Sequence, residues 1–269
     1  MVVTKIVFGK RRRQAATQLE YLVEIYLSSL LKAGQIYGQY FIAWKDGLLN
    51  AYAQIPGPSA LELRYHSELG REHHDQIKLA FGSEPVWEML NDNASKRERG
   101  WRGAPFFYLF SHAFLFGPAI HRGDNGRPIP PYLFPVTAEI REDLYFWQNS
   151  YRDHDRIWLD SRELEMSAYR ELASPNSQLS RRGRRICRAI EDATGIPIFY
   201  YLVRYWGREQ YQEIRRLCPG CGHRWRQSVK GNKFWQFPFR CNRCRLVSHL
   251  ADSDDDKRHA RIGEPPSAG

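Results

Sequence analysis

Four cysteines near the end of the chain form the pattern with the clearest chemistry. They lie in two Cys-x-x-Cys pairs, Cys218 with Cys221 and Cys241 with Cys244, and 19 residues separate the pairs. Each pair can turn tightly enough to direct two thiolates at one point, and two pairs complete the tetrahedron of a zinc ribbon. Zn²⁺ suits thiolates because it is borderline soft and imposes no other geometry. We predict one structural Zn²⁺, with no open position for a substrate.

Other uses of these cysteines fit the sequence less well. A disulfide framework needs an oxidising compartment, and residues 1–10 do not resemble a signal peptide. A redox motif usually has one such pair, not two matched ones. No stretch approaches the ~20 apolar residues of a membrane span, so we expect a cytoplasmic protein without membrane contact. The fifth cysteine, Cys187, is predicted to be a small buried hydrophobic residue.

The positive charge is concentrated around the cysteines. The formal net charge is +10, but residues 1–180 contain 21 basic and 21 acidic side chains. Residues 181–250 contain 16 basic against 4 acidic side chains, and residues 251–269 contain 3 against 5. A positive field of this size attracts polyanions, of which nucleic acid is the most abundant.

Cations alternate with aromatic rings in this segment, which is typical of a surface that pairs with phosphates and stacks on bases. The predicted contacts to nucleic acid or a partner are Arg224, Trp225, Arg226, Lys230, Lys233, Trp235, Arg240, Arg243 and Arg245. Because no recognition helix is evident, we expect little sequence readout. Three alternatives stay open: the rings shield the metal, the arginines form a solvated face, or the patch meets an acidic protein.

The titratable residues elsewhere show no catalytic motif. Neighbouring side chains on a helix point about 100° apart, so His73 and His74 cannot easily share a metal, and the Asp153–Asp155 run has the same difficulty. His112 reads as a core histidine, and the loop at residues 121–125 is the best remaining candidate. No nucleophile elbow, phosphate-binding loop or His-Glu-x-x-His pattern is present, so we predict a protein that is not an enzyme. Near the cysteines, His223 and His249 are more plausible as neighbours of the site than as ligands.

The order of predicted helices and strands indicates an α+β protein with a mixed sheet, covering helices and a small C-terminal all-β zinc ribbon. Residues 1–90 predict a first α+β domain in the order strand, helix, hairpin, strand, helix. Its segments are 2–8, 14–32, 38–44 with 48–55, 61–65 and 68–81.

Residues 104–206 predict a central region with long helices. Its expected elements are a buried strand at 106–116, an irregular loop at 117–135, helices from 137, at 162–172 and at 180–193, and a strand at 196–205. The ribbon is expected at 207–250, docked through 196–205, and residues 251–269 are expected to be a disordered acidic tail.

The segment from Cys187 through Thr194-Gly195-Ile196-Pro197 to Tyr205, followed by the two cysteine pairs, resembles a bacterial family of unknown function. Its members are described as zinc-ribbon-containing proteins with a suggested role in nucleic-acid binding. The resemblance covers nearly the whole chain, with weaker blocks at 34–36, 107–110, 128–132, 147–148 and 155–159. It implies the metal and the architecture. Some relatives carry extra cysteines near residues 122–125; this chain has none there, so no second metal is implied.

Two functions therefore remain open. The first is nucleic-acid binding through the basic C-terminal module. The alternative is a protein-binding factor, such as an immunity protein that neutralises a bacterial toxin, with the neutral first domain as its interface.

Overall fold

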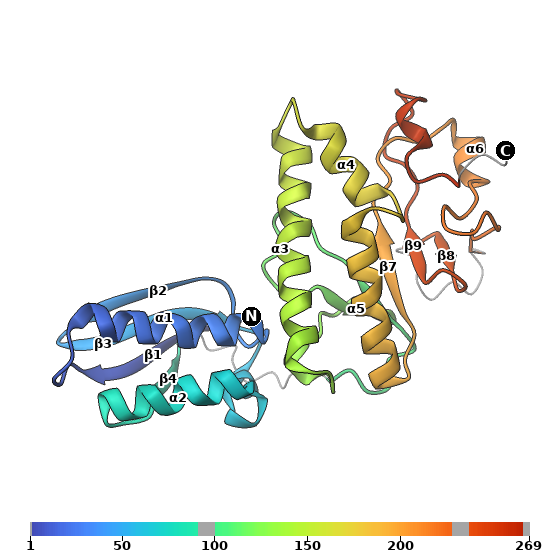
Figure 1. The fold of residues 1–269 in the computed structure, drawn as a ribbon. Coiled ribbons are helices and arrows are strands. Elements are labelled where there is room, and N and C mark those ends of the chain that lie inside the picture. Colours follow the sequence, from blue (N-terminus) through green and yellow to red (C-terminus); the bar gives the residue numbers. More distant parts are fainter. Residues whose placement is uncertain (1, 91–99, 228–236, 266–269) are drawn as a thin grey trace. The chain divides into compact units, whose positions relative to one another are not determined.

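The computed structural model describes residues 2–90, 100–227 and 237–265, and the chain folds into two compact units (Figure 1). The first unit contains residues 1–101, 116–118 and 129–145. The second contains residues 102–115, 119–128 and 146–269, and therefore all the cysteines.

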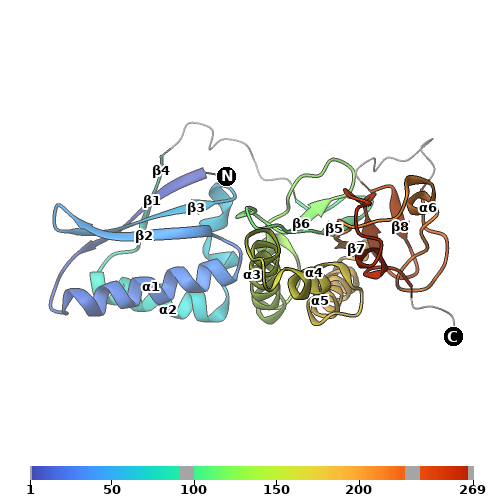
Figure 2. The same ribbon diagram turned by 90° about the horizontal axis from the view of Figure 1, so that it is seen from above.

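The first unit has a βαββαβ order and one antiparallel sheet. Its elements are β1 (Val2–Lys10), α1 (Ala16–Lys32), β2 (Tyr37–Lys45), β3 (Leu48–Ile55), α2 (Glu68–Phe81) and β4 (Val86–Met89). The strands lie in the order β2-β3-β1-β4, which is the ferredoxin-like arrangement. Figure 2 shows both helices on one face of this sheet.

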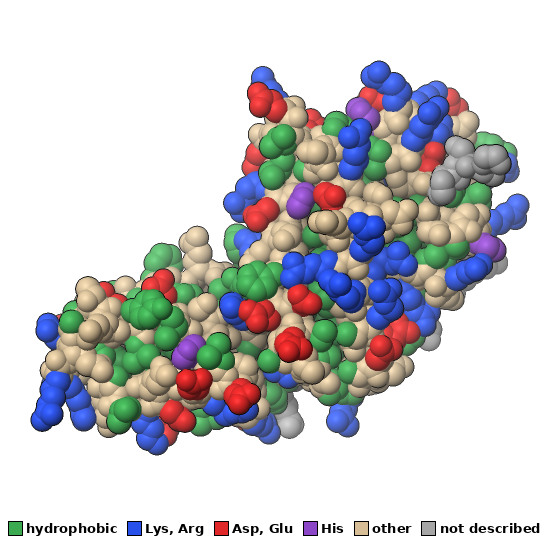
Figure 3. All heavy atoms as spheres, viewed as in Figure 1, with side chains coloured by type: hydrophobic (Ala, Val, Ile, Leu, Met, Phe, Trp, Pro, Cys, Tyr) green, Lys and Arg blue, Asp and Glu red, His purple; other side chains and the backbone are tan. Residues whose placement is uncertain are grey.

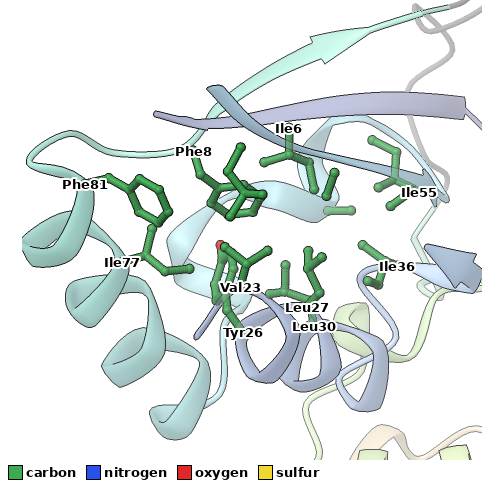
Figure 4. Packing of buried hydrophobic residues seen from close by; sticks show 14 of the residues in the cluster. Ile6, Phe8, Val23, Tyr26, Leu27, Leu30, Ile36, Ile55, Ile77 and Phe81 are labelled. Carbon is green, nitrogen blue, oxygen red and sulfur yellow. The ribbon is translucent and has the colours of Figure 1, made fainter. Parts of the chain in front are cut away.

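The core of the first unit forms between that sheet and the two helices (Figure 4). Alternate residues of β1, including Ile6 and Phe8, point inward because successive side chains on a strand face opposite ways. Val23, Tyr26 and Leu27 of α1 recur at helical spacing and meet them. The sequence pattern for this helix and for the hairpin is confirmed.

Two details of the first unit differ from the prediction. Residues 61–65 belong to short 3₁₀ turns, Pro58–Leu61 and Leu63–Tyr65, and do not form a strand. The fourth strand is instead β4, which pairs antiparallel with β1. Its four residues alternate weakly between exposed and half-buried, so their sequence carries little strand signal.

The second unit contains a five-stranded mixed sheet in the order β6-β5-β7-β9-β8. Its strands are β5 (Phe107–Leu109), β6 (Ile120–Arg122), β7 (Ile198–Leu202), β8 (Phe239–Cys241) and β9 (Leu246–Ser248). Strands β5, β7 and β9 are parallel, while β6 and β8 run antiparallel to their neighbours. The expected strand at 106–116 is thus only three residues long, because its β6 partner pairs with those three alone.

Long helices pack on the sheet of the second unit. They are α3 (Ala138–Asp160), which enters this unit at Phe146, α4 (Glu165–Ala173) and α5 (Gln178–Thr194). Trp147 of α3 is fully buried and its ring lies 5.9 Å from that of Tyr200 on β7. A Cβ atom on Gly183 of α5 would lie 2.2 Å from the Tyr200 ring, so only glycine allows this approach.

The sequence had predicted a separate all-β module for the cysteine segment, and the structure differs. Strands β8 and β9 belong to the five-stranded sheet of the second unit, since β9 pairs with β7 over Tyr200–Leu202. It also contains a short helix, α6 (Gln210–Ile214). The prediction that this segment docks through residues 196–205 is confirmed by the β7–β9 pairing.

The prediction of a disordered tail is wrong for residues 251–265. Ser253 forms a β-bridge with Trp206, and His259–Arg261 form a 3₁₀ turn with Ala260 fully buried. The buried Arg204 guanidinium donates to the Ala260 and Ile262 carbonyls at 2.6 and 2.8 Å. A polar sequence is held here by hydrogen bonds to a buried cation. Among the described helices, none is both long and apolar enough to span a membrane.

Candidate metal centre and its basic surroundings

The first cysteine pair lies in a tight hydrogen-bonded turn. The backbone N–H of Cys218 donates to the His223 carbonyl at 2.9 Å, and the N–H of Gly222 donates to the Cys218 carbonyl at 2.8 Å. Gly222 has φ +68°, a conformation that glycine adopts without steric cost. A β-bridge between Leu217 and Arg224 closes the base of the turn. This geometry brings the two ends of a Cys-Pro-Gly-Cys sequence close together.

The second pair lies in the turn between β8 and β9. Cys241 is the last residue of β8, and the N–H of Cys244 donates to the Cys241 sulfur at 3.3 Å. Arg245 follows with φ +53°, an uncommon conformation for a residue with a side chain. The thiolate is the form of cysteine that binds metal.

The structure brings the four predicted ligands together. All four Sγ atoms lie within 4.8 Å of one another, and those of Cys221 and Cys241 are 3.7 Å apart. Sulfur atoms bound 2.3 Å from one zinc ion in a tetrahedron would be about 3.8 Å apart. A Cβ atom on Gly220 would lie 2.9 Å from the Cys244 sulfur, so the turn packs closely against the cluster.

The four cysteines could therefore hold a metal ion. All of them are free thiols, with Cys218 and Cys241 buried and the other two partly exposed. Four protein sulfurs fill a tetrahedral coordination sphere and leave no position for water or substrate. In the described residues no other group of three or more His, Cys, Asp or Glu side chains is placed to hold an ion.

A buried aromatic pair supports the cysteine turns. Trp225 is 2% exposed, its ring lies 5.3 Å from that of Phe239, and its indole N–H donates to the Arg216 carbonyl at 3.0 Å. The Arg216 guanidinium lies 4.8 Å from the Trp225 ring and 4.2 Å from the Phe239 ring. The prediction that Trp225 stacks on a base is wrong, because its ring is not accessible.

The arginines predicted to bind a polyanion divide into two groups. Arg224, Arg226 and Arg243 are exposed and form no ion pair with any described residue. Arg245 instead pairs with Glu191 at 2.7 Å. Arg240 is half-buried, and its guanidinium lies 5.8 Å from the rings of Phe106 and Phe199. Lys230, Lys233 and Trp235 lie outside the described residues.

A buried charged network that the sequence did not predict joins α6 to the segments before and after it. The Glu213 carboxylate accepts from Arg204 at 2.9 Å and from Arg216 at 2.8 Å, and all three side chains are at most 4% exposed. Burial raises the pKa of Glu213, but the two guanidiniums outweigh this effect and lower it overall. The Glu264 carboxylate adds a contact to Arg204 at 3.5 Å and to Arg208 at 2.7 Å. Glu213 and Arg216 are only three residues apart, whereas Arg204 and Glu264 are 60 residues apart and meet only in the fold.

The histidines singled out in the sequence do not converge on one site. The His249 ring is hydrogen-bonded to the Tyr201 hydroxyl at 2.9 Å and donates to the Asp252 carboxylate at 3.3 Å. His121 is buried against the Tyr108 ring, and burial lowers its pKa to about 4. The Asp155 carboxylate accepts from the backbone N–H of Ala113 at 2.6 Å, which indicates a structural role.

The remaining candidates also have local contacts. His74 is buried 6.1 Å from the His66 ring in the first unit. In the loop at residues 121–125, Arg122 donates to both carboxylate oxygens of Asp124, at 3.0 and 2.8 Å. His223 is exposed and contacts the Cys221 carbonyl.

Three family models match successive parts of the chain. Each is described as a domain of unknown function: DUF8589 over residues 1–91, DUF2310 over 102–203 and DUF8594 over 207–254. The boundaries between the matches lie near residues 100 and 205.

Two curated relatives from Haemophilus influenzae, both called uncharacterized protein, are each 38% identical to this chain. One match covers 61% of this chain and 63% of the relative, and the other covers 49% and 64%. The chain thus spans just under two thirds of the length of these relatives. A solved structure titled antibiotic biosynthesis monooxygenase is 10% identical, covers 34% of this chain and 97% of its own, and has a TM-score of 0.26. That similarity is too low to support any statement about this protein.

Proposed function

We propose that this chain binds nucleic acid through phosphate contacts made by a surface that a structural zinc ion holds in shape. The observation that carries the proposal is the exposure of Arg224, Arg226 and Arg243 beside the four-cysteine cluster. Other arginines of the same segment are neutralised by Glu191, Glu213 and Glu264 in ion pairs. Arg224, Arg226 and Arg243 have no such carboxylate partner among the described residues and can attract an anion.

Zinc is the metal that best fits the donor set. Four thiolates in a tetrahedron favour Zn²⁺ or an iron–sulfur centre, whereas Mg²⁺ and Ca²⁺ require oxygen ligands. The 3.7 Å separation of two sulfurs supports a single ion at their centre. The role of the ion is to fix the turn on which the arginines lie, and the proposed activity is binding, not catalysis.

The proposed contact is to the nucleic-acid backbone. Guanidinium groups bind phosphate oxygens in a two-pronged geometry and are not selective for sequence. Because Trp225 is buried, it cannot contribute base stacking. We therefore expect affinity that depends strongly on salt and weakly on sequence.

The test is a fluorescence-anisotropy titration of the full, metal-loaded chain with labelled single-stranded and duplex DNA over a range of salt concentrations. The triple variant R224A/R226A/R243A should bind more weakly to every sequence. On duplex DNA, the slope of the logarithm of the binding constant against the logarithm of salt concentration should be less steep by about two to three units. A matched control is R11A/R12A/R13A, which removes three exposed cations between β1 and α1.

A wild-type chain that forms no complex with either DNA at low salt overturns the proposal. So does an equal loss of affinity in the control variant, because total charge would then explain binding. Co-purification with an acidic protein partner, without DNA binding, would favour the toxin-neutralising alternative.

A further inference from the structure

Helix α5 carries a row of arginines on one face. Arg181, Arg184, Arg185 and Arg188 recur at intervals of three and four residues, which places them side by side along the helix. The opposite face is apolar and buried, and its members are Leu179, Ser180, Gly183, Ile186, Cys187 and Ile190. We call the four arginines the α5 arginine face.

These side chains lack acidic partners. Within the described residues, no carboxylate forms an ion pair with any of the four arginines of this face. Glu191, one turn further along α5, is already paired with Arg245. Like charges three or four residues apart on a helix repel one another, and an anion bound between them would relieve that repulsion.

The face also borders a hollow in the surface. A depression of about 630 Å³ is lined by Gln178, Arg181, Arg182, Arg184, Arg185 and Arg188, all from this helix. Figure 3 shows the basic side chains gathered over α5. Among the residues that the structure describes, no apolar side chain lines the depression.

The helix cannot rotate to hide these charges. Gly183 lies too close to the Tyr200 ring for any other residue, and the Trp147 indole N–H donates to the Leu179 carbonyl at 3.2 Å. The Ser177 hydroxyl caps the first turn and Gly195 ends the helix in a left-handed conformation. The arginines are therefore presented on a fixed scaffold.

We propose that the α5 arginine face is a second phosphate-binding surface that holds the backbone of a nucleic-acid strand. Arg188 lies seven helical steps after Arg181, a rise of about 10 Å. Successive phosphates of one strand rise about 3.4 Å along a duplex, so the face spans about three such steps. The proposal takes its class of ligand from the proposed function but concerns different residues.

Two other partners fit this surface less well. Stable protein interfaces usually contain aromatic or aliphatic anchors at their centre, and none lies in this depression. A membrane-surface helix needs an exposed apolar face, whereas that of α5 is buried on the sheet. A phosphate backbone needs neither.

The test compares two triple variants of the full, metal-loaded chain. R181Q/R185Q/R188Q removes three exposed arginines of the face, and R156Q/R162Q/R170Q removes three exposed arginines from α3, α4 and the turn between them. Labelled 24-nucleotide DNA, single-stranded and duplex, is titrated by anisotropy at several salt concentrations. The first variant should bind roughly tenfold more weakly, with a duplex salt slope about two units shallower, while the second should change little.

Four outcomes are decisive. If R181Q/R185Q/R188Q binds like wild type while R224A/R226A/R243A is weakened, this inference fails and the proposed function stands. If wild type binds no DNA, the proposed function fails, and the inference fails with it. If poly-glutamate of equal charge competes as well as DNA, the nucleic-acid assignment fails. If the triple variant loses its folded circular dichroism, the single reversal R185E replaces it, and unchanged affinity there overturns the inference.

Discussion

Arg245 donates to both carboxylate oxygens of Glu191, at 2.7 and 3.1 Å. Arg245 follows the last cysteine of the cluster directly, and Glu191 lies in the last turns of α5. The pair therefore links the candidate metal centre to the helix that carries the α5 arginine face. Both basic surfaces belong to one folded unit.

Glu191→Gln should weaken that link without unfolding the protein. The pair is about one third exposed on the arginine side, so we expect a loss of about 1 kcal/mol in the free energy of unfolding. Urea denaturation followed by circular dichroism measures this loss. Glu88→Gln, which removes the partner of Lys5 in the first unit, is the matched control and should leave the second unit's transition unchanged.

Replacing Cys221 or Cys244 by serine should abolish stoichiometric metal binding. A missing thiolate leaves three ligands, and metal binding in structural zinc sites contributes folding free energy directly. Metal content by mass spectrometry should fall from one zinc per chain to near zero, and the melting temperature should fall with it.

Cys187→Ala is the control for metal content, because Cys187 is buried in α5 away from the cluster. Chelation of wild type should reproduce the cysteine variants. A purified wild-type chain without bound metal, or a C187A variant that loses it, would contradict the prediction.

Trp225→Ala should destabilise the second unit by about 3–5 kcal/mol, because it empties a buried space and leaves the Arg216 carbonyl without its donor. It should also weaken zinc retention in a chelator competition, since the ring supports the first cysteine turn. DNA affinity per metal-loaded molecule should stay unchanged. A W225A variant that loses affinity only for single-stranded DNA would contradict this prediction and indicate that Trp225 stacks on a base.

Glu213→Gln should be among the most damaging single changes. It leaves the buried Arg216 guanidinium without a carboxylate partner and Arg204 with only the 3.5 Å contact to Glu264, at a cost of about 3–5 kcal/mol. The pKa of Glu213 is lowered in the folded state, so the stability it contributes is present at neutral pH and is lost as acid protonates it. Urea midpoints at neutral pH should show the loss, whereas Glu209→Gln, at an exposed pair with Lys257, should change little.

His66 should make the first unit less stable in mild acid. Burial lowers its pKa from 6.5 to about 4, so the folded state disfavours the proton that the unfolded chain accepts. Stability should be constant above pH 6.5 and fall by up to about 3 kcal/mol as pH drops towards 4. The slope of unfolding free energy against pH measures this uptake, and His66→Gln should reduce it by about one proton. His121 contributes a similar slope in the second unit, and an unchanged slope in H66Q would refute the assignment.

Local patterns predicted much of the first unit and the ligand set of the candidate site. The alternation of β1, the helical spacing in α1 and the Lys45-Asp46-Gly47 turn each depend on nearby residues, and each is present. The tight Cys-x-x-Cys turns are also local, which is why the four sulfurs could be named from spacing alone. The short strand β4 was missed because its neighbour β1 supplies most of its order.

Residue types and spacing were enough to predict the four thiols, the basic excess of residues 181–250 and the presence of both helices and strands. Which charges remain without a partner depends on how the elements pack. Ion pairs such as Arg204 with Glu213 and Arg245 with Glu191 join residues whose pairing depends on how strands and helices pack. Packing likewise buried Trp225 and left Arg181, Arg185 and Arg188 of α5 exposed, because a helix that buries one face against a sheet must present the other to solvent.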